Sequence, residues 1–127
     1  MLSNLGNILL FGSIFITLSI IYFAYQNIKE KNILIGKNLV YLSFFQITFI
    51  ITSFLLLIFA FVFSDFSLLA VYQNSHTAKP IFYKIAGVWG NHEGSLLLWV
   101  NIMVIFSFLF FLFNYKFKKS YSLYTLL

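Results

Sequence analysis

Three long stretches without a formal charge constrain this chain more than any other feature of its sequence. They run over residues 1–28, 38–64 and 94–115. Each exceeds the roughly 20 apolar residues that a helix needs to cross the hydrocarbon core of a bilayer. Because lipid offers no hydrogen-bond partners to the backbone, each stretch must satisfy its own peptide groups, which a helix does within one segment. The sequence therefore predicts three membrane-spanning helices.

The composition indicates lipid rather than water as the solvent. Of the 127 residues, 61% are hydrophobic and 9% are charged, whereas soluble domains carry charge on about a quarter of their residues. The chain has no Cys, which excludes disulfides and thiolate metal sites. The first stretch lacks the basic start and the cleavage site of a secretory signal peptide, so we expect it to be retained. We predict an all-α integral membrane protein, one membrane segment over residues 1–127, with spans at about 6–28, 38–64 and 94–115.

The lysines predict how the three spans are oriented. All basic residues are Lys, and they concentrate after the first and third spans: Lys29, Lys31 and Lys37 with Glu30, then Lys116, Lys118 and Lys119. Loops on the cytoplasmic or matrix side carry an excess of basic residues, so both segments are predicted there. The N-terminus and the outer loop 65–93 then face outward. The lysines form no patch with interleaved aromatic residues, so we expect no nucleic-acid binding.

A short amphipathic helix is predicted in the loop 65–93. Pro80 suits the first turn of a helix, and Lys84 lies on a different face from the apolar residues. Those apolar residues recur at helical spacing: Ile81, Phe82, Ile85, Val88 and Trp89. Such a helix would lie in the outer membrane interface. The alternative is an aromatic belt, because Trp and Tyr gather at membrane interfaces in any case, and we favour this for Phe82 and Tyr83 individually.

Polar residues cluster where the third uncharged stretch begins, in the sequence WGNHEGSLLLW from Trp89 to Trp99. Asn91 is a predicted helix N-cap, which places Glu93 in the first turn. There the carboxylate meets the positive end of the helix dipole, an interaction of about 0.3–1 kcal/mol. This electrostatic interaction alone could explain the presence of Glu93. The alternative explanation is a functional role.

A helical wheel divides this cluster into two faces, with Glu93 between them, at roughly 100° per residue. Gly90, Gly94 and Asn101 form one face, and His92, Ser95 and Trp99 form a nearly opposite one. The glycine spacing would let another helix backbone approach closely. A helix with two specialised faces is expected to be buried between partners rather than surrounded by lipid.

No metal site or catalytic centre is predicted from these residues. His92 has no second ligand at metal spacing, and nothing in the sequence fixes its distance from His76. His92 is therefore either a hydrogen-bonded structural residue at a helix interface or a contact to a cofactor. The sequence has no nucleophile–base constellation, carboxylate pair or phosphate-binding loop, so the chain alone is not expected to be catalytic.

A further set of residues precedes the motif WGNHEGSLLLW: Ser64, Asp65, Phe66, Ser67, Val71, Asn74, Ser75, Thr77, Pro80, Tyr83, Lys84 and Ala86. Together with the motif they resemble the N-terminal region of the CcmF family, integral membrane proteins of cytochrome c maturation. The first two spans fit that family by hydropathy and position only. The motif positions that match, without an implied catalytic role, are Trp89, Gly90, His92, Glu93, Gly94, Ser95, Leu97, Leu98 and Trp99.

The resemblance implies a part in the haem lyase step. CcmF proteins receive haem from the chaperone CcmE and, with CcmH-type partners, help attach it to apocytochrome c on the outer side of the membrane. Full-length members have many more spans than the three predicted here. They also have a tryptophan-rich WWD segment and haem-ligating histidines, and no residue of this chain matches either feature. The resemblance therefore implies a split gene, whose partners are the remaining CcmF polypeptides, a CcmH-type protein, CcmE, apocytochrome c and membrane lipid. Haem b would belong to the assembled complex.

The predicted location is the mitochondrial inner membrane, with the N-terminus toward the intermembrane space. Phe, Ile, Leu, Asn, Lys and Tyr dominate the sequence, and AT-rich codons typical of organellar genomes favour these residues. If the gene is not organellar, the predicted location is a bacterial inner membrane. The chain is either the natural product of a split gene or a degenerate remnant of a longer one. The competing class is a small organelle-encoded accessory subunit of a respiratory complex, which fits the composition and spans equally well. A transporter fragment ranks last because no span has a charge at its centre.

Overall fold

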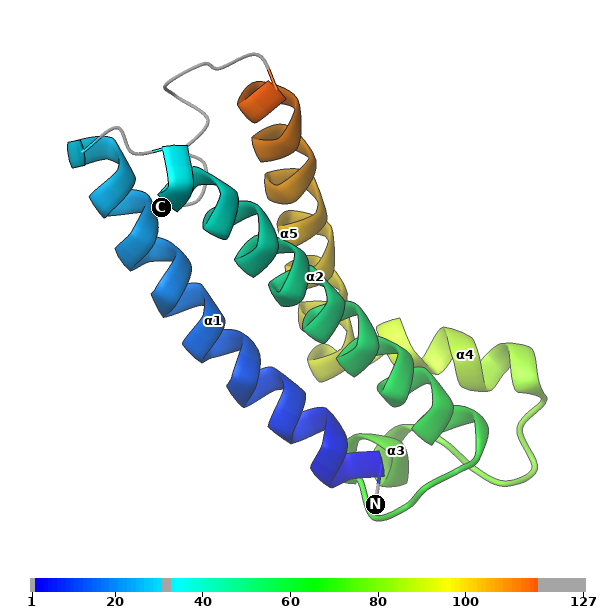
Figure 1. Ribbon diagram of the computed structural model, residues 1–127. Helices are drawn as coiled ribbons and strands as arrows, with labels where there is room; N and C mark the ends of the chain where they lie inside the picture. The colour runs from blue at the N-terminus through cyan, green and yellow to red at the C-terminus, as the bar shows by residue number, and fades with distance from the viewer. Residues whose placement is uncertain (1, 31–32, 117–127) are drawn as a thin grey trace.

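Five helices form the described part of the chain, residues 2–30 and 33–116 of a computed structural model. They are α1 (Leu2–Glu30), α2 (Ile33–Val62), α3 (Leu69–Asn74), α4 (Ile81–Trp89) and α5 (His92–Lys116). Figure 1 shows α1 and α2 running antiparallel, with α5 beside α2, and with α3 and α4 at the end of the bundle where α1 begins. We call residues 63–91, which link α2 to α5, the connecting segment.

Three of these helices are long and apolar enough to cross a membrane, which confirms the predicted all-α fold. The qualifying segments are Asn4–Asn27, Asn38–Val62 and His92–Phe113, each end within two residues of the predicted span. The orientation stays a prediction. Among the lysines that support it, Lys31, Lys118 and Lys119 lie outside the described residues.

Small and polar side chains line the contacts between the three long helices together with a few large apolar ones. The buried residues are Ser13, Ile20, Ala24 and Asn27 in α1; Leu39, Ser43, Ile50, Ser53 and Ala60 in α2; and Asn101 and Phe111 in α5. Large side chains such as Phe15 and Phe106, which are 70% and 67% exposed, point outward. In lipid no hydrophobic force drives helices together, so close approach and paired polar groups favour association.

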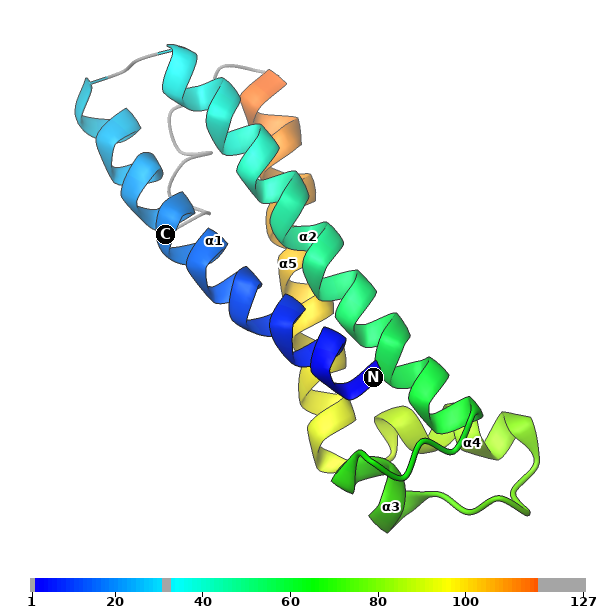
Figure 2. The same ribbon diagram turned by 60° about the horizontal axis from the view of Figure 1, so that its bottom comes forward.

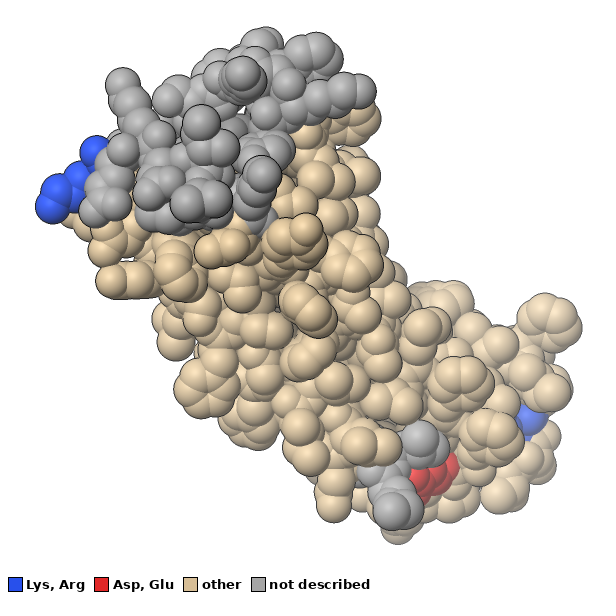
Figure 3. Space-filling view, viewed as in Figure 1, with Lys and Arg blue, Asp and Glu red and all other residues tan. Residues whose placement is uncertain are grey.

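The charged residues visible on the molecule lie at its two ends. Figure 3 shows that the visible face between the ends carries no Lys, Arg, Asp or Glu. A charge in the bilayer core costs several kcal/mol, so this distribution fits a bundle that crosses the membrane along its long axis.

The connecting segment packs against the end of α2. Val71 of α3 and Val88 of α4 are fully buried in a core cluster with Ala60 and Phe61 of α2. In Figures 1 and 2, α4 lies across the end of α2 and leads directly into α5. The predicted short helix is therefore present, although Pro80 stands at its N-cap position, one residue before the first turn.

The buried face of α4 differs from the predicted one. Lys84 was expected on another face from the apolar residues, yet Lys84 and Val88 are the buried residues of this helix. Ile81 and Phe82 are 61% and 86% exposed. The physical reason is that Lys84 meets the C-terminal end of α2, where free carbonyl groups and the helix dipole favour a positive charge.

Candidate functional site

The motif WGNHEGSLLLW spans a sharp joint between α4 and α5, held by the side chain of Asn91. Its Oδ1 accepts a hydrogen bond from the Gly94 N–H at 2.7 Å. Its Nδ2 donates to the carbonyl oxygens of Gly87 at 2.7 Å and Val88 at 2.9 Å. One buried amide thus satisfies an N–H group at the start of α5 and two carbonyl groups at the end of α4. The prediction of Asn91 as the N-cap is confirmed.

Gly94 lets the backbones of α4 and α5 meet at this joint. A Cβ atom at position 94 would overlap the Val88 carbonyl oxygen and lie 2.8 Å from the Val88 carbonyl carbon. The sequence predicted that another backbone approaches Gly94 closely, and in the described structure that backbone is α4 of the same chain.

The other two residues of the predicted glycine face lie apart from Gly94. Gly90 is the exposed C-cap residue of α4, not part of α5, because the chain turns at residues 90–91. A single helical wheel therefore does not extend over Gly90. Asn101 is buried in α5, where its amide donates to the Leu97 carbonyl at 2.8 Å. Packing of these residues against another polypeptide stays a prediction.

The face formed by His92, Ser95 and Trp99 is open in the described structure. His92 is exposed, Trp99 is 68% exposed, and the Ser95 hydroxyl donates to the His92 carbonyl at 3.0 Å. The His92 imidazole makes no hydrogen bond to any described residue. Its ring nitrogens are therefore accessible to a group outside the described chain.

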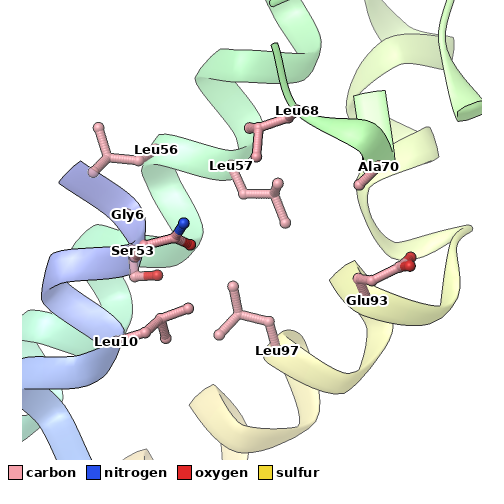
Figure 4. A pocket seen from close by; sticks show the side chains of 10 residues that line it. Gly6, Leu10, Ser53, Leu56, Leu57, Leu68, Ala70, Glu93 and Leu97 are labelled. Carbon is pink, nitrogen blue, oxygen red and sulfur yellow. The ribbon is translucent and has the colours of Figure 1, made fainter. Parts of the chain in front are cut away.

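A cavity of about 280 Å³ lies beside the start of α5, between α1, α2 and the connecting segment. Figure 4 shows Leu10, Leu57 and Leu97 pointing into it, while the Glu93 carboxylate points away from its centre. Ser53, on one wall, is 3% exposed, and its hydroxyl has no hydrogen-bond partner among the described residues. The motif thus contributes one rim residue and one wall residue to a mostly apolar cavity.

Sequence reasoning predicted where Glu93 lies but did not predict the cavity. Glu93 is in the first turn of α5, as expected. Leu10, Ser53 and Leu57 carried no signal, because apolar and small residues are ordinary in membrane spans and only packing brings these three to the motif.

Two lysines of the connecting segment bind the C-terminal ends of helices. Lys84 is 8% exposed, and its Nζ donates to Ser64 Oγ at 2.7 Å and to the Val62 carbonyl at 3.4 Å. Lys79, which is exposed, donates to the Asn74 carbonyl at 2.9 Å. Both ammonium groups satisfy carbonyl oxygens that a helix leaves free at its end.

Ser64 occupies a backbone conformation that glycine usually takes. Its φ of 55° is the only positive value at a described non-glycine residue. The Ser64 N–H bonds to Phe61 O at 3.2 Å and the Asp65 N–H bonds to Ala60 O at 2.9 Å, which is the Schellman pattern at a helix C-terminus. The hydrogen bond from Lys84 helps to hold this turn.

No cluster of three or more His, Asp or Glu side chains suitable for a metal ion occurs among the described residues. The geometry of the described residues therefore supports a rigid joint and an open polar face.

Comparisons with known proteins identify relatives of this chain. The chain is 61% identical over 61 residues to the cytochrome c-type biogenesis protein Ccl1 of Rhodobacter capsulatus. The matched segment covers 48% of this chain and 9% of that protein. The chain is 57% identical, also over 61 residues, to CycK of Bradyrhizobium diazoefficiens. Against CcmF of Haemophilus influenzae it is 32% identical over 111 residues, 85% of this chain and 17% of the relative.

These relatives are far longer than the chain, which spans 9% of Ccl1 and of CycK. No protein-family model matches the chain. No solved structure matches it either. The chain is homologous, over part of its length, to the CcmF, Ccl1 and CycK proteins of cytochrome c biogenesis.

Proposed function

We propose that this chain is the N-terminal membrane section of a CcmF-type haem lyase and helps deliver haem to apocytochrome c and attach it there. The observation that carries the proposal is the 61% identity over 61 residues to a cytochrome c-type biogenesis protein. The chain spans 9% of that relative, and we propose that other polypeptides supply the remainder. We propose these as the remaining CcmF polypeptides of a split gene, together with a CcmH-type protein, the chaperone CcmE and apocytochrome c.

The described residues do not form a haem pocket by themselves. The cavity beside the start of α5 has a volume of about 280 Å³ and is lined mostly by leucine. It offers no imidazole or thioether that could ligate iron. The open face of His92 instead fits an edge contact to haem or to a partner, with the rest of the binding site on other polypeptides. Haem b is therefore proposed for the assembled complex and not for this chain alone.

The joint between α4 and α5 gives this face a fixed position. Asn91 ties both helices, and Gly94 lets them meet. His92 is the first residue of α5, and these contacts hold the start of that helix in a fixed position. In this proposal a rigid scaffold presents the imidazole and the neighbouring indole of Trp99, which is 68% exposed.

We further propose the mitochondrial inner membrane as the location, with the N-terminus and the motif on the intermembrane-space side. The lysine distribution and the organellar composition support this location. In a bacterial source the corresponding location is the inner membrane.

The test compares two exposed histidines. His92→Ala should lower the amount of c-type cytochrome, measured by haem staining, while the level of the chain in the membrane stays unchanged. His76→Ala, in the connecting segment outside the motif, is the matched control and should leave c-type cytochromes at the wild-type level. Normal c-type cytochrome in the His92→Ala strain would overturn the proposed role of His92.

Purification separates the haem lyase from the competing class of protein. A tagged chain should bring down a CcmH-type protein and a polypeptide with the WWD segment. If it instead follows a respiratory complex, and its loss leaves c-type cytochromes intact, the proposed function is wrong.

A further inference from the structure

A second cavity, of about 90 Å³, lies between α1, α2 and α5. Its polar lining comes from all three helices: Thr17 of α1, Ser43 and Gln46 of α2, and Ser107 of α5. Ser43 stands nineteen residues before Val62, about 28 Å along the helix at roughly 1.5 Å per residue. The cavity is thus inside the predicted span and far from the connecting segment, with Ser43 five residues from the start of the span at Asn38.

One pair of these side chains is already bonded. Gln46 Nε2 donates to Thr17 Oγ1 at 2.8 Å, which links α2 to α1. The Thr17 hydroxyl in turn donates to the Ser13 carbonyl at 2.8 Å. The Gln46 amide is therefore held in place beside the cavity, with its Oε1 lacking a partner among the described residues.

Ser43 and Ser107 are not bonded to any described residue. Ser43 is 2% exposed, and its Oγ is a buried atom without a hydrogen-bond partner. Other hydroxyls in the spans, such as those of Ser19 and Thr48, donate to the carbonyl four residues earlier. Ser43 does not, although rotation about its one χ1 torsion can turn the hydroxyl toward the cavity. Buried polar groups normally have a partner, so a group outside the described chain is needed.

We propose that this cavity binds water, which bridges Ser43 and Gln46 of α2 to Ser107 of α5. A volume of about 90 Å³ accommodates two or three molecules at roughly 30 Å³ each, and a buried water needs two to four polar partners. A lipid chain would leave three polar groups unsatisfied. A cation is disfavoured because no carboxylate lines the cavity.

Bridging water would add hydrogen bonds between α5 and α2, which also meet through the rings of Phe44 and Phe108, 6.4 Å apart. Since the first residues of α5 belong to the motif, water between α2 and α5 would help fix the angle at which α5 carries His92 outward. This role is independent of haem attachment and does not rest on the proposed function.

The test uses the side-chain amides of Gln26, Gln46 and Gln73, the glutamines of this chain. The full chain, labelled with ¹⁵N-glutamine in lipid bilayers, is studied by solid-state NMR with magnetisation transferred from water. The Gln46 signal, assigned as the one lost in Gln46→Leu, should receive magnetisation although Gln46 lies eight residues inside the span that starts at Asn38. Gln73, which is exposed, is the positive control. A Gln46 signal that receives none while Gln73 does would overturn the proposal.

A variant tests the bridge itself. Ser107→Ala should reduce the transfer to Gln46 at least twofold. Thr48→Ala removes a hydroxyl of α2 that is exposed and does not line the cavity, so it should leave the transfer unchanged. Equal transfer in wild type and Ser107→Ala would show that water does not bridge these helices. If the transfer from water to Gln46 disappears when the chain is assembled with its co-purifying polypeptides, a side chain of those polypeptides occupies the cavity. That result would also overturn the proposal.

Discussion

Replacing Gly94 by alanine should loosen the joint between α4 and α5 more than replacing any other glycine of the described chain by alanine. The new Cβ would overlap the Val88 carbonyl oxygen and stand 2.8 Å from its carbon. Both atoms belong to the backbone, so no side-chain rotation relieves the overlap. The start of α5 and the end of α4 must move apart.

This separation affects the hydrogen bonds of Asn91. The Gly94 N–H loses its cap at Asn91 Oδ1, now at 2.7 Å, and Asn91 Nδ2 loses Val88 O, now at 2.9 Å. Loss of an N-cap typically costs about 1 kcal/mol, loss of one further hydrogen bond about 1 kcal/mol, and overpacking about 1–3 kcal/mol. Alanine recovers up to about 1 kcal/mol in helix propensity. The expected net destabilisation is about 3 kcal/mol.

The assay is denaturant or thermal unfolding of the purified chain in lipid nanodiscs, followed by tryptophan fluorescence. The chain has two tryptophans, Trp89 and Trp99, and they flank the joint. Gly6→Ala is the matched control, because no atom lies within 4 Å of its added Cβ, and it should unfold like wild type or slightly later. If Gly94→Ala unfolds within about 1 kcal/mol of Gly6→Ala, the assignment of Gly94 to a backbone contact is incorrect.

Two further predictions concern the connecting segment. Lys84→Met should destabilise the chain by about 1–2 kcal/mol, because the buried ammonium no longer satisfies the end of α2; Lys79→Met, which removes an exposed ammonium from the end of α3, should shift the unfolding midpoint less. Ser67→Ala should raise the pKa of Asp65 toward its ordinary value of 3.8, because the Ser67 hydroxyl and then its backbone N–H hold that pKa down in the folded chain, and an NMR titration measures it. The resulting stabilisation is complete above the unfolded pKa and is lost as pH falls through the lower folded pKa, so the difference in stability between wild type and Ser67→Ala should shrink progressively as pH falls below 3.8.

Features that depend on neighbouring residues in the sequence were predicted well. The spans follow from uncharged length alone, because the thickness of the bilayer sets that length. Asn91 was recognisable as an N-cap because its partner Gly94 is three residues away. The resemblance to the CcmF family rested on residues within one stretch of the sequence, and homology to the CcmF, Ccl1 and CycK proteins over part of the chain confirms it. The split mitochondrial form stays a prediction.

Features that depend on tertiary contacts were not predictable in the same way. Helical periodicity separated Lys84 from the apolar residues of α4, but burial is decided by the end of α2, which attracts its ammonium. The spacing of Gly90 and Gly94 indicated one helix face, whereas the turn between α4 and α5 divides them. The cavity beside the motif depends on Ser53, which sequence periodicity cannot place opposite α5.

The joint also separates motif residues that have an explanation within this chain from those that do not. Gly94 permits the α4 contact, and Leu97 fills the wall of a cavity. The indoles of Trp89 and Trp99 are explained in part by the membrane interface, where tryptophan gathers. An exposed imidazole at His92 contributes neither packing nor a hydrogen bond to the described residues. Variants should therefore divide into two classes: Gly94 substitutions reduce the amount of folded chain, whereas His92 substitutions preserve the chain and reduce only its function. A His92→Ala chain that unfolds as early as Gly94→Ala would show that both positions serve the fold.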